Sequence, residues 1–160
     1  MNLTLQTDYA FRTMMFLAVK APELATIQEI STHYKISRGH LMVIVNKLGN
    51  LGYLDTVRGR GGGIRLLRPA NEIRLGEVVL AMEPHFHLVE CFQPEANHCL
   101  ISRSCRLRGV LDQALRAWFD VLNGYTLADL VRKNVELTSL LDVSGANTLT
   151  DTIKESAPMQ

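Results

Sequence analysis

Apolar residues in the first fifty positions recur with the period of an amphipathic α-helix, interrupted twice by short polar breaks. The pattern predicts three helices: Asp8–Lys20, a second from Thr26, and a third from Ser37 to about Asn50. Thr7 or Asp8 suits the start of the first helix. Thr26 and Glu29 have the spacing of a capping box, and Ser37 is a favourable N-cap for the third helix.

Residues 53–67 change to the pattern of a short β-hairpin. Tyr53–Val57 is rich in β-branched and aromatic residues, and Ile64–Leu67 forms the return strand. The intervening turn Arg58–Gly63 is glycine-rich, which suits backbone with positive φ. The order helix, turn, helix, hairpin predicts a mainly α fold with one small β-hairpin, the winged helix-turn-helix.

A winged helix contacts DNA with its third helix and its wing, so exposed polar residues there are candidate contacts. Arg38 suits guanine, while Ser37 at a helix N-terminus suits phosphate. The candidate DNA-binding residues are Ser37, Arg38, Gly39, His40, Lys47, Arg58, Gly59 and Arg60. Each of them can equally be a solvated surface residue. A nucleotide-binding loop is disfavoured because the glycine run lacks the G-x-x-x-x-G-K-[ST] pattern and leads into a strand.

The second half of the chain predicts a short helix over Leu75–Met82, a long amphipathic helix from Cys105 to Asn123, and a short helix over Leu127–Lys133. The long helix has an apolar stripe suited to pairing with its twin, and packing on its own domain is the alternative. We therefore expect a DNA-binding domain at 1–70, a cysteine loop with a dimerisation helix at 71–135, and a flexible tail at 136–160.

Composition agrees with a folded DNA-binding protein. Of the 160 residues, 47% are hydrophobic and the formal net charge is +1, which permits a buried core. Residues 1–70 contain nine basic and four acidic residues, whereas 71–160 contain eight and twelve, so the basic half coincides with the predicted winged helix. No apolar run approaches the ~18 residues that span a bilayer. We expect a cytoplasmic protein without a membrane partner, in which thiols stay reduced.

All three cysteines lie between residues 91 and 105, with the spacing C-x7-C-x5-C. This spacing differs from the C-x2-C pairs of common zinc sites and lacks a fourth thiol. Three thiolates on one loop suit a metal cluster with one position left for another ligand. The alternatives are three buried structural cysteines, or a zinc site completed by His98. Nucleophile–base pairs and C-x-x-C redox pairs are absent from the sequence, so an enzyme is not expected.

Several segments together resemble a known family. Tyr9-Ala10, the wing Val57–Ile64 and the three cysteines before a long helix resemble the bacterial winged-helix iron–sulfur repressors that include the cluster-assembly regulator IscR. Residues 89–92, 105–111 and 124–130 are most similar to the nitric-oxide-sensing members of that family. The resemblance implies a homodimeric transcriptional repressor of operator DNA, with one cluster per subunit held by Cys91, Cys99 and Cys105. It implies a 4Fe-4S cluster, with 2Fe-2S as the alternative.

The resemblance also bears on the fourth ligand and the effector. Members of the cluster-assembly type have a histidine shortly after the third cysteine, whereas Cys105 is followed here by Arg106 and Leu107. Nitric-oxide-sensing members use an aspartate of the first helix, supplied by the partner subunit, and Asp8 occupies that place. His98 ranks below Asp8. Nitric oxide is the expected effector, and sensing of iron or cluster supply is the alternative.

Overall fold

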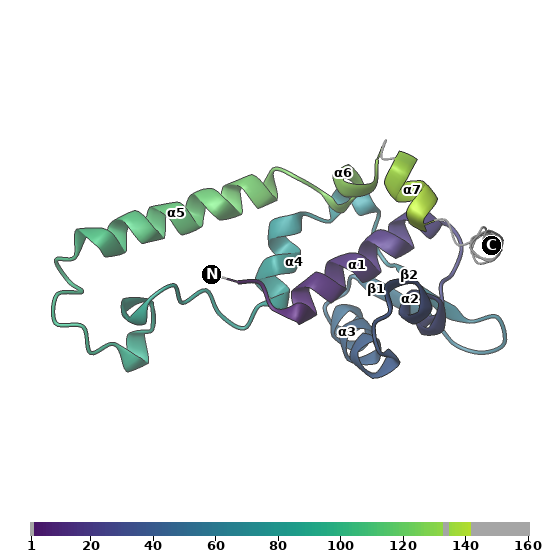
Figure 1. Ribbon diagram of the computed structural model, residues 1–160, viewed down its shortest axis with the longest axis horizontal. Coiled ribbons are helices and arrows are strands. Elements are labelled where there is room, and N and C mark those ends of the chain that lie inside the picture. Colours follow the sequence, from purple (N-terminus) through teal and green to yellow (C-terminus); the bar gives the residue numbers. More distant parts are fainter. Residues whose placement is uncertain (1, 133–134, 142–160) are drawn as a thin grey trace, which may run out of the picture.

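The computed structural model describes residues 2–132 and 135–141, and within them the chain folds as a winged helix-turn-helix with a helical arm (Figure 1). The helices and strands of the winged helix are α1 Leu5–Lys20, α2 Ile27–Tyr34, α3 Arg38–Asn50, β1 Leu54–Val57 and β2 Gly63–Leu66. Their buried apolar residues form one core, which α4 also joins. The mainly helical fold with a two-stranded hairpin predicted from the sequence is therefore confirmed.

The first helix begins three residues earlier than predicted. Thr4, and not Thr7 or Asp8, is its N-cap, because the Thr4 side chain accepts a hydrogen bond from the Thr7 backbone N–H. Thr7 instead lies fully buried inside the first turn, and Asp8 stands in that turn as its acidic residue. Residues such as Met14 and Leu17 then anchor α1 in the core.

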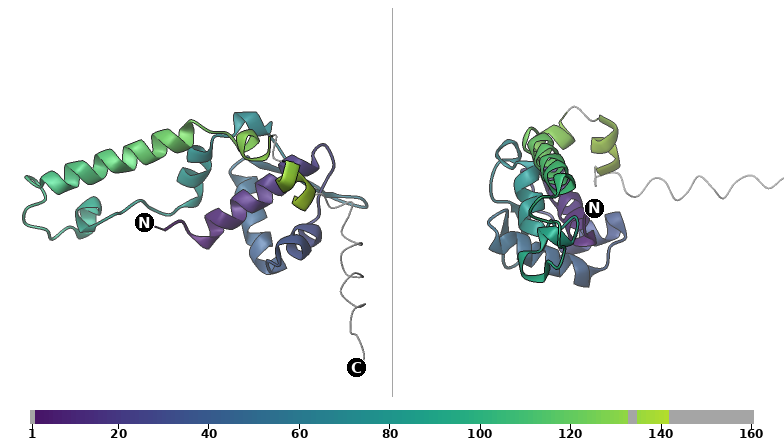
Figure 2. Two further views of the ribbon diagram at one scale, coloured as in Figure 1. Left: turned by 45° about the horizontal axis from the view of Figure 1, so that its top comes forward. Right: turned by 90° about the vertical axis from the view of Figure 1, so that its left-hand side faces the viewer.

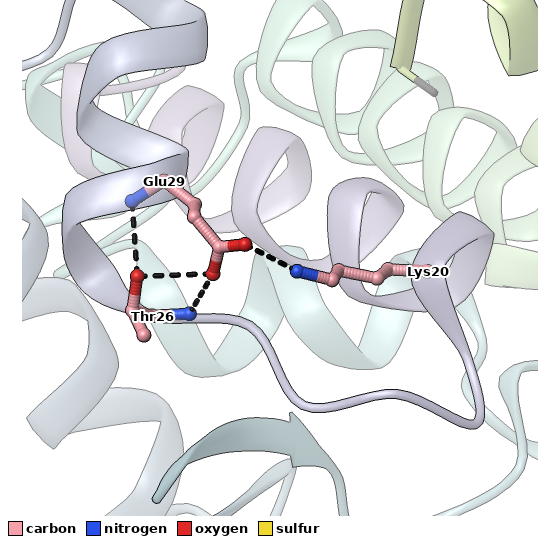
Figure 3. Close-up of polar contacts among 3 residues, drawn as sticks. All are labelled: Lys20, Thr26 and Glu29. Carbon is pink, nitrogen blue, oxygen red and sulfur yellow. Dashed lines mark hydrogen bonds and ion pairs between the residues drawn. The ribbon is translucent and has the colours of Figure 1, made fainter. Parts of the chain in front are cut away.

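The predicted start of α2 is confirmed. The Thr26 side chain accepts from the Glu29 backbone N–H at 3.1 Å, and the Glu29 carboxylate accepts from the Thr26 backbone N–H at 2.6 Å. The other carboxylate oxygen of Glu29 pairs with Lys20 at the end of α1 (Figure 3). The capping residue Glu29 therefore also joins α2 to the end of α1.

The wing is an antiparallel hairpin in which Leu54 pairs with Leu66 and Val57 with Gly63. Its tip turns through Gly59 and Gly61, whose φ values of 102° and 77° strongly favour glycine. Ile64 is buried and bonds the backbone of Ala25, so the wing is tied to the loop before α2.

The second half contains the arm, which consists of the cysteine loop and α5. After a 3-10 turn at Ala70–Glu72 come α4 Leu75–Met82, two more 3-10 turns at Glu90–Phe92 and Pro94–Ala96, α5 Arg106–Asn123, α6 Leu127–Val131 and α7 Val135–Leu141. In both Figure 1 and Figure 2 the segment between α4 and α5 runs away from the winged helix, and α5 returns toward it. None of the described helices is long and apolar enough to cross a membrane.

The arm joins the core where α4 meets the end of α5. A Cβ on Gly76 would lie 2.1 Å from the Asn123 side-chain oxygen, so a larger residue here would require the Asn123 side chain to shift. Leu127 of α6 is fully buried in the main core. α6 ends at Val131, two residues before the predicted end.

The first residues of the predicted C-terminal tail form a helix. Val135–Leu141 forms α7, and Leu141 is buried, whereas the sequence predicts a flexible tail over residues 136–160. Residues 142–160, the rest of that predicted tail, lie outside the described residues.

Candidate functional site

The N-terminal turn of α3 presents a polar exposed surface. Ser37, Arg38, Gly39 and His40 are all exposed, and the Ser37 hydroxyl accepts from the His40 backbone N–H at 3.3 Å. On the opposite face, Leu41 and Ile44 are buried, which fixes the outward orientation of the turn. This geometry suits insertion of the helix start into a major groove.

The wing tip presents a second basic surface. Arg58, Gly59 and Arg60 are exposed, and neither guanidinium has an ion-pair partner in the described part of the chain. By contrast, Arg65 on β2 is already paired with Asp55 at 2.8 Å. The two tip arginines are therefore available for phosphate.

We expect Arg58→Ala or Arg60→Ala to weaken DNA binding similarly on all sequences, because phosphate contacts carry no base information. The slope of log K against log salt should become shallower by about 0.9 for each phosphate that the variant no longer neutralises. A filter-binding titration over several salt concentrations measures that slope. Arg132→Ala, which removes an exposed charge in the second half of the chain, is the matched control. An unaltered slope in a wing variant would remove that arginine from the interface.

Lys47 has a contact that the sequence did not indicate. Its ammonium donates a hydrogen bond to the backbone carbonyl of Met82, at 2.9 Å, and the side chain is half-buried. It thus links α3 to the end of α4, and the predicted contact with the DNA backbone stays a prediction.

The cysteine loop is organised by short local hydrogen bonds. Cys91 lies in the 3-10 turn Glu90–Phe92, and Cys105 is the N-cap residue of α5. The Asn97 side chain accepts from the Cys99 backbone N–H and donates to the Ser102 hydroxyl, both at 3.1 Å. All three thiols are free and half-buried, which suits ligands that are held in place but still reachable.

Two of the three cysteines share a cavity. Cys91 and Cys105 line a pocket of about 500 Å³ between the loop and the first turns of α5. Three guanidinium groups also line it, from Arg103, Arg108 and Arg116, although Arg116 is paired with Asp112. Positive charge of this kind favours an anionic group bound in the cavity. The chemistry of three thiols on one loop with arginines nearby therefore suits a thiolate-held iron–sulfur group.

The candidate ligands do not all converge within one chain. No three histidine, cysteine or carboxylate groups of the described residues lie close enough to hold a single metal ion. Cys99 does not line the cavity that Cys91 and Cys105 share. Binding would therefore require the loop to draw Cys99 inward.

Asp8 lies on α1, and its carboxylate is 42% exposed and paired with Arg12 at 2.7 Å. An exposed pair of this kind contributes only about 0.5 kcal/mol, so Arg12 can release the carboxylate at little cost. The rival His98 is exposed, and its backbone N–H is bonded to Glu90. The other nearby histidines, His85 and His87, stack on each other with ring centroids 4.7 Å apart.

The apolar residues of α5 differ in their surroundings along the helix. Phe86 packs its ring against Phe119 at 4.8 Å and Trp118 at 6.2 Å, so part of the predicted stripe packs on its own chain. Nearer the start of the helix, Leu107 and Val110 are 61% and 60% exposed. No residue of this 18-residue helix is buried in the single chain.

One further cluster of hydrogen-bonded polar residues could not be predicted from the sequence. Glu83, just after α4, accepts hydrogen bonds from Thr4 and Thr7, which stand 79 and 76 positions earlier in the chain. Residues so distant in sequence are brought together only by the packing of α4 on α1. The cavity arginines lacked a signal for the same reason.

Known proteins are similar along almost the whole chain. Residues 3–133 match the Rrf2 family, described as iron-dependent transcriptional regulators. The HTH-type transcriptional regulators NsrR of Bacillus subtilis and Bacillus licheniformis are 48% and 47% identical over 88% of this chain, covering 97% and 99% of their own lengths. The crystal structure of oxidised CymR from Staphylococcus aureus has a TM-score of 0.66 and 26% identity, covering 82% of this chain and 97% of that one. The structure of IscR from T. potens has a TM-score of 0.66 at 20% identity, covering 86% of this chain and 90% of that one, which supports the shared fold.

Proposed function

Because the chain belongs to the Rrf2 family of iron-dependent transcriptional regulators, we propose that it represses operator DNA as a homodimer and releases it when nitric oxide reacts at an iron–sulfur cluster. The family resemblance inferred from sequence is thereby confirmed, and the protein is a regulator and not an enzyme. Nitric oxide as effector, the iron–sulfur cluster and the homodimer go beyond this family assignment and are our proposal.

The observation that carries the proposal is the shared cavity of Cys91 and Cys105, with Cys99 on the same loop and arginines around it. Iron held there by thiolates would supply a binding site for a small diatomic molecule such as nitric oxide. The cysteines hold the group, and Arg103 and Arg108 offset its negative charge. Residues 89–92 and 105–111, which resemble nitric-oxide-sensing family members, flank this cavity.

A 4Fe-4S group with Asp8 as its fourth ligand is the arrangement we favour. Carboxylate oxygen is a hard ligand and binds iron less firmly than thiolate, so Asp8 is the easiest of the four to displace. Within the described residues of one chain Asp8 forms no metal-binding cluster with the cysteines, so ligation by Asp8 would require it to reach across a homodimer. Loss of such a bond would release the first turn of α1, and α1 packs against α3.

Operator release needs little energy once α3 can shift. Two recognition helices must match half-sites about 34 Å apart, so a small change in their separation weakens binding. A hundredfold loss corresponds to about 2.7 kcal/mol, the scale of two ordinary hydrogen bonds.

The direct test is a nitric oxide titration of anaerobically purified protein, followed by visible absorbance and by operator binding. We expect an absorbing protein whose colour bleaches in steps while DNA affinity falls. A coloured protein indifferent to nitric oxide would instead support an iron-supply or cluster-supply sensor, the second function that the family description favours. A colourless protein containing zinc would exclude both.

We expect Asp8→Ala to keep DNA binding but to change the visible spectrum and weaken the response to nitric oxide, because it removes a ligand. Arg12→Ala is the matched control, since it breaks the same ion pair and leaves the carboxylate in place. Absorbance and circular dichroism of both proteins distinguish the two roles. Identical spectra for Asp8→Ala and the unmodified protein would show that Asp8 is not a ligand.

A further inference from the structure

Three functional parts of the molecule meet at the end of α4. Glu83 terminates this helix, its backbone N–H bonded to the Val79 carbonyl at 3.0 Å, and the chain continues from there to Cys91. The first turn of α1 and the side of α3 reach the same point through Thr4 and Lys47. In Figure 1 the start of α1 lies beside the end of α4 where the cysteine loop departs.

A single carboxylate oxygen of Glu83 makes the connection to α1. Its Oε1 accepts from the Thr4 backbone N–H at 2.7 Å, the Thr4 hydroxyl at 3.1 Å and the Thr7 hydroxyl at 2.5 Å. Thr4 is the N-cap of α1 and Thr7 is fully buried, so both ends of the contact are fixed. Asp8 directly follows Thr7, and its backbone N–H is bonded to the Thr4 carbonyl.

The neighbouring residue extends the connection to the DNA-reading helix. Lys47 of α3 donates to the carbonyl of Met82, the residue before Glu83. Met82 is buried in the core, so this carbonyl cannot move independently of α4. Partial burial raises the pKa of the Glu83 carboxyl, but the hydrogen bonds from Thr7 and Thr4 and the charge of Lys47 outweigh it and lower that pKa below 4.5. Glu83 is therefore ionised at neutral pH.

We infer that Glu83 is a positioning residue that couples the cysteine loop to DNA binding, by holding the base of the loop, the Asp8-bearing turn of α1 and α3 as one unit. This inference rests on the proposed function, because it names the route by which a change at the loop reaches α3. Hydrogen-bonded networks of ionised and buried groups have two arrangements, made and broken, rather than a continuous range. The Glu83–Thr4–Thr7 contact is such an element.

The decisive quantity is the ratio of operator affinities before and after nitric oxide treatment, measured for the full chain. Coupling between two sites is typically about 5–150-fold. We expect Glu83→Ala to lower the ratio of the unmodified protein by at least about fivefold, with the iron content unchanged because the three cysteines remain. Glu83→Gln should retain most of the ratio, because its amide oxygen can accept from the same three donors. Glu72→Ala is the matched control, since it removes an exposed carboxylate without a side-chain partner in the described residues.

A second readout needs no bound iron. In cluster-free protein, Glu83→Ala should increase amide hydrogen exchange at residues 4–8, whereas Glu83→Gln and Glu72→Ala should not. If Glu83→Ala does not fold, Thr7→Val tests the same contact. Valine has nearly the shape of the buried threonine but cannot donate the hydrogen bond to Glu83. This variant should lower the affinity ratio and loosen residues 4–8.

The outcomes separate the two ideas. An unmodified protein whose operator affinity does not respond to nitric oxide would contradict the proposed function itself. A responsive unmodified protein whose affinity ratio is unchanged in Glu83→Ala and Thr7→Val would overturn the role of Glu83 and leave the proposed function standing.

Discussion

Leu107→Asp combined with Val110→Asp is expected to abolish tight operator binding. The two side chains are one helical turn apart on α5 and are 61% and 60% exposed in the single chain. If this face pairs with its twin, two carboxylates per subunit would be buried against apolar surface and against each other, which no dimer tolerates. Separated subunits bind one half-site each and lose the benefit of simultaneous engagement, which amounts to about 10²–10⁴-fold in affinity.

The measurement has two parts. Sedimentation or light scattering should show a monomer, and operator binding should weaken by at least about 100-fold. Leu140→Asp on α7 is the control, because Leu140 is 66% exposed and lies outside α5. Circular dichroism should be unchanged in every variant, since none of the three residues is buried. A dimer that survives the double substitution would mean that another surface joins the subunits.

The parts of the fold that sequence predicts well are those determined by near neighbours. The capping box of Thr26 and Glu29 and the N-cap at Ser37 are complete within three residues, so the starts of α2 and α3 are correct. The glycines of the wing tip are equally local, because positive φ is a property of single residues. Each of these signals is contained in the segment that it describes.

Prediction from sequence is less accurate for features that depend on contacts between residues far apart in the chain. Thr4, Thr7 and Asp8 are all acceptable helix caps, and the choice of Thr4 is reinforced by Glu83, 79 residues away. Lys47 is a basic residue of α3 and therefore resembles a DNA contact in sequence. In the structure its side chain bonds the carbonyl of Met82, which belongs to another helix. The cavity beside Cys91 takes its positive charge from Arg103 of the loop and from Arg108 and Arg116 of α5, which look like ordinary solvated residues in sequence.

The same limit applies to the cysteines. Their spacing shows that three thiols lie on one loop, but it cannot show which of them face one another. The structure places Cys91 and Cys105 on a common cavity and leaves Cys99 outside its lining. Cys105 directly precedes α5, so the start of that helix at Arg106 decides where this thiol lies in the fold.

Replacement of any one cysteine by serine is therefore expected to abolish iron binding and the response to nitric oxide together. Serine has nearly the same size, but its hydroxyl remains protonated at neutral pH and is a poor ligand for iron that thiolates hold well. The test is most informative for Cys99→Ser, since Cys99 is the thiol that must move to join the other two. Iron and sulfide content, visible absorbance and operator affinity with and without nitric oxide are the measurements.

His98→Ala is the matched control, because His98 is the immediate neighbour of Cys99 and the rival ligand. We expect it to keep its iron, its spectrum and its response, whereas Cys99→Ser loses all three. Loss of iron in both variants would make His98 a ligand and displace Asp8 from that role. Retention of iron and response in Cys99→Ser would mean that Cys91 and Cys105 suffice with ligands from elsewhere, and the three-cysteine site would be wrong. Loss confined to the cysteine variant gives each thiol a necessary role and leaves the fourth position to be decided by Asp8→Ala.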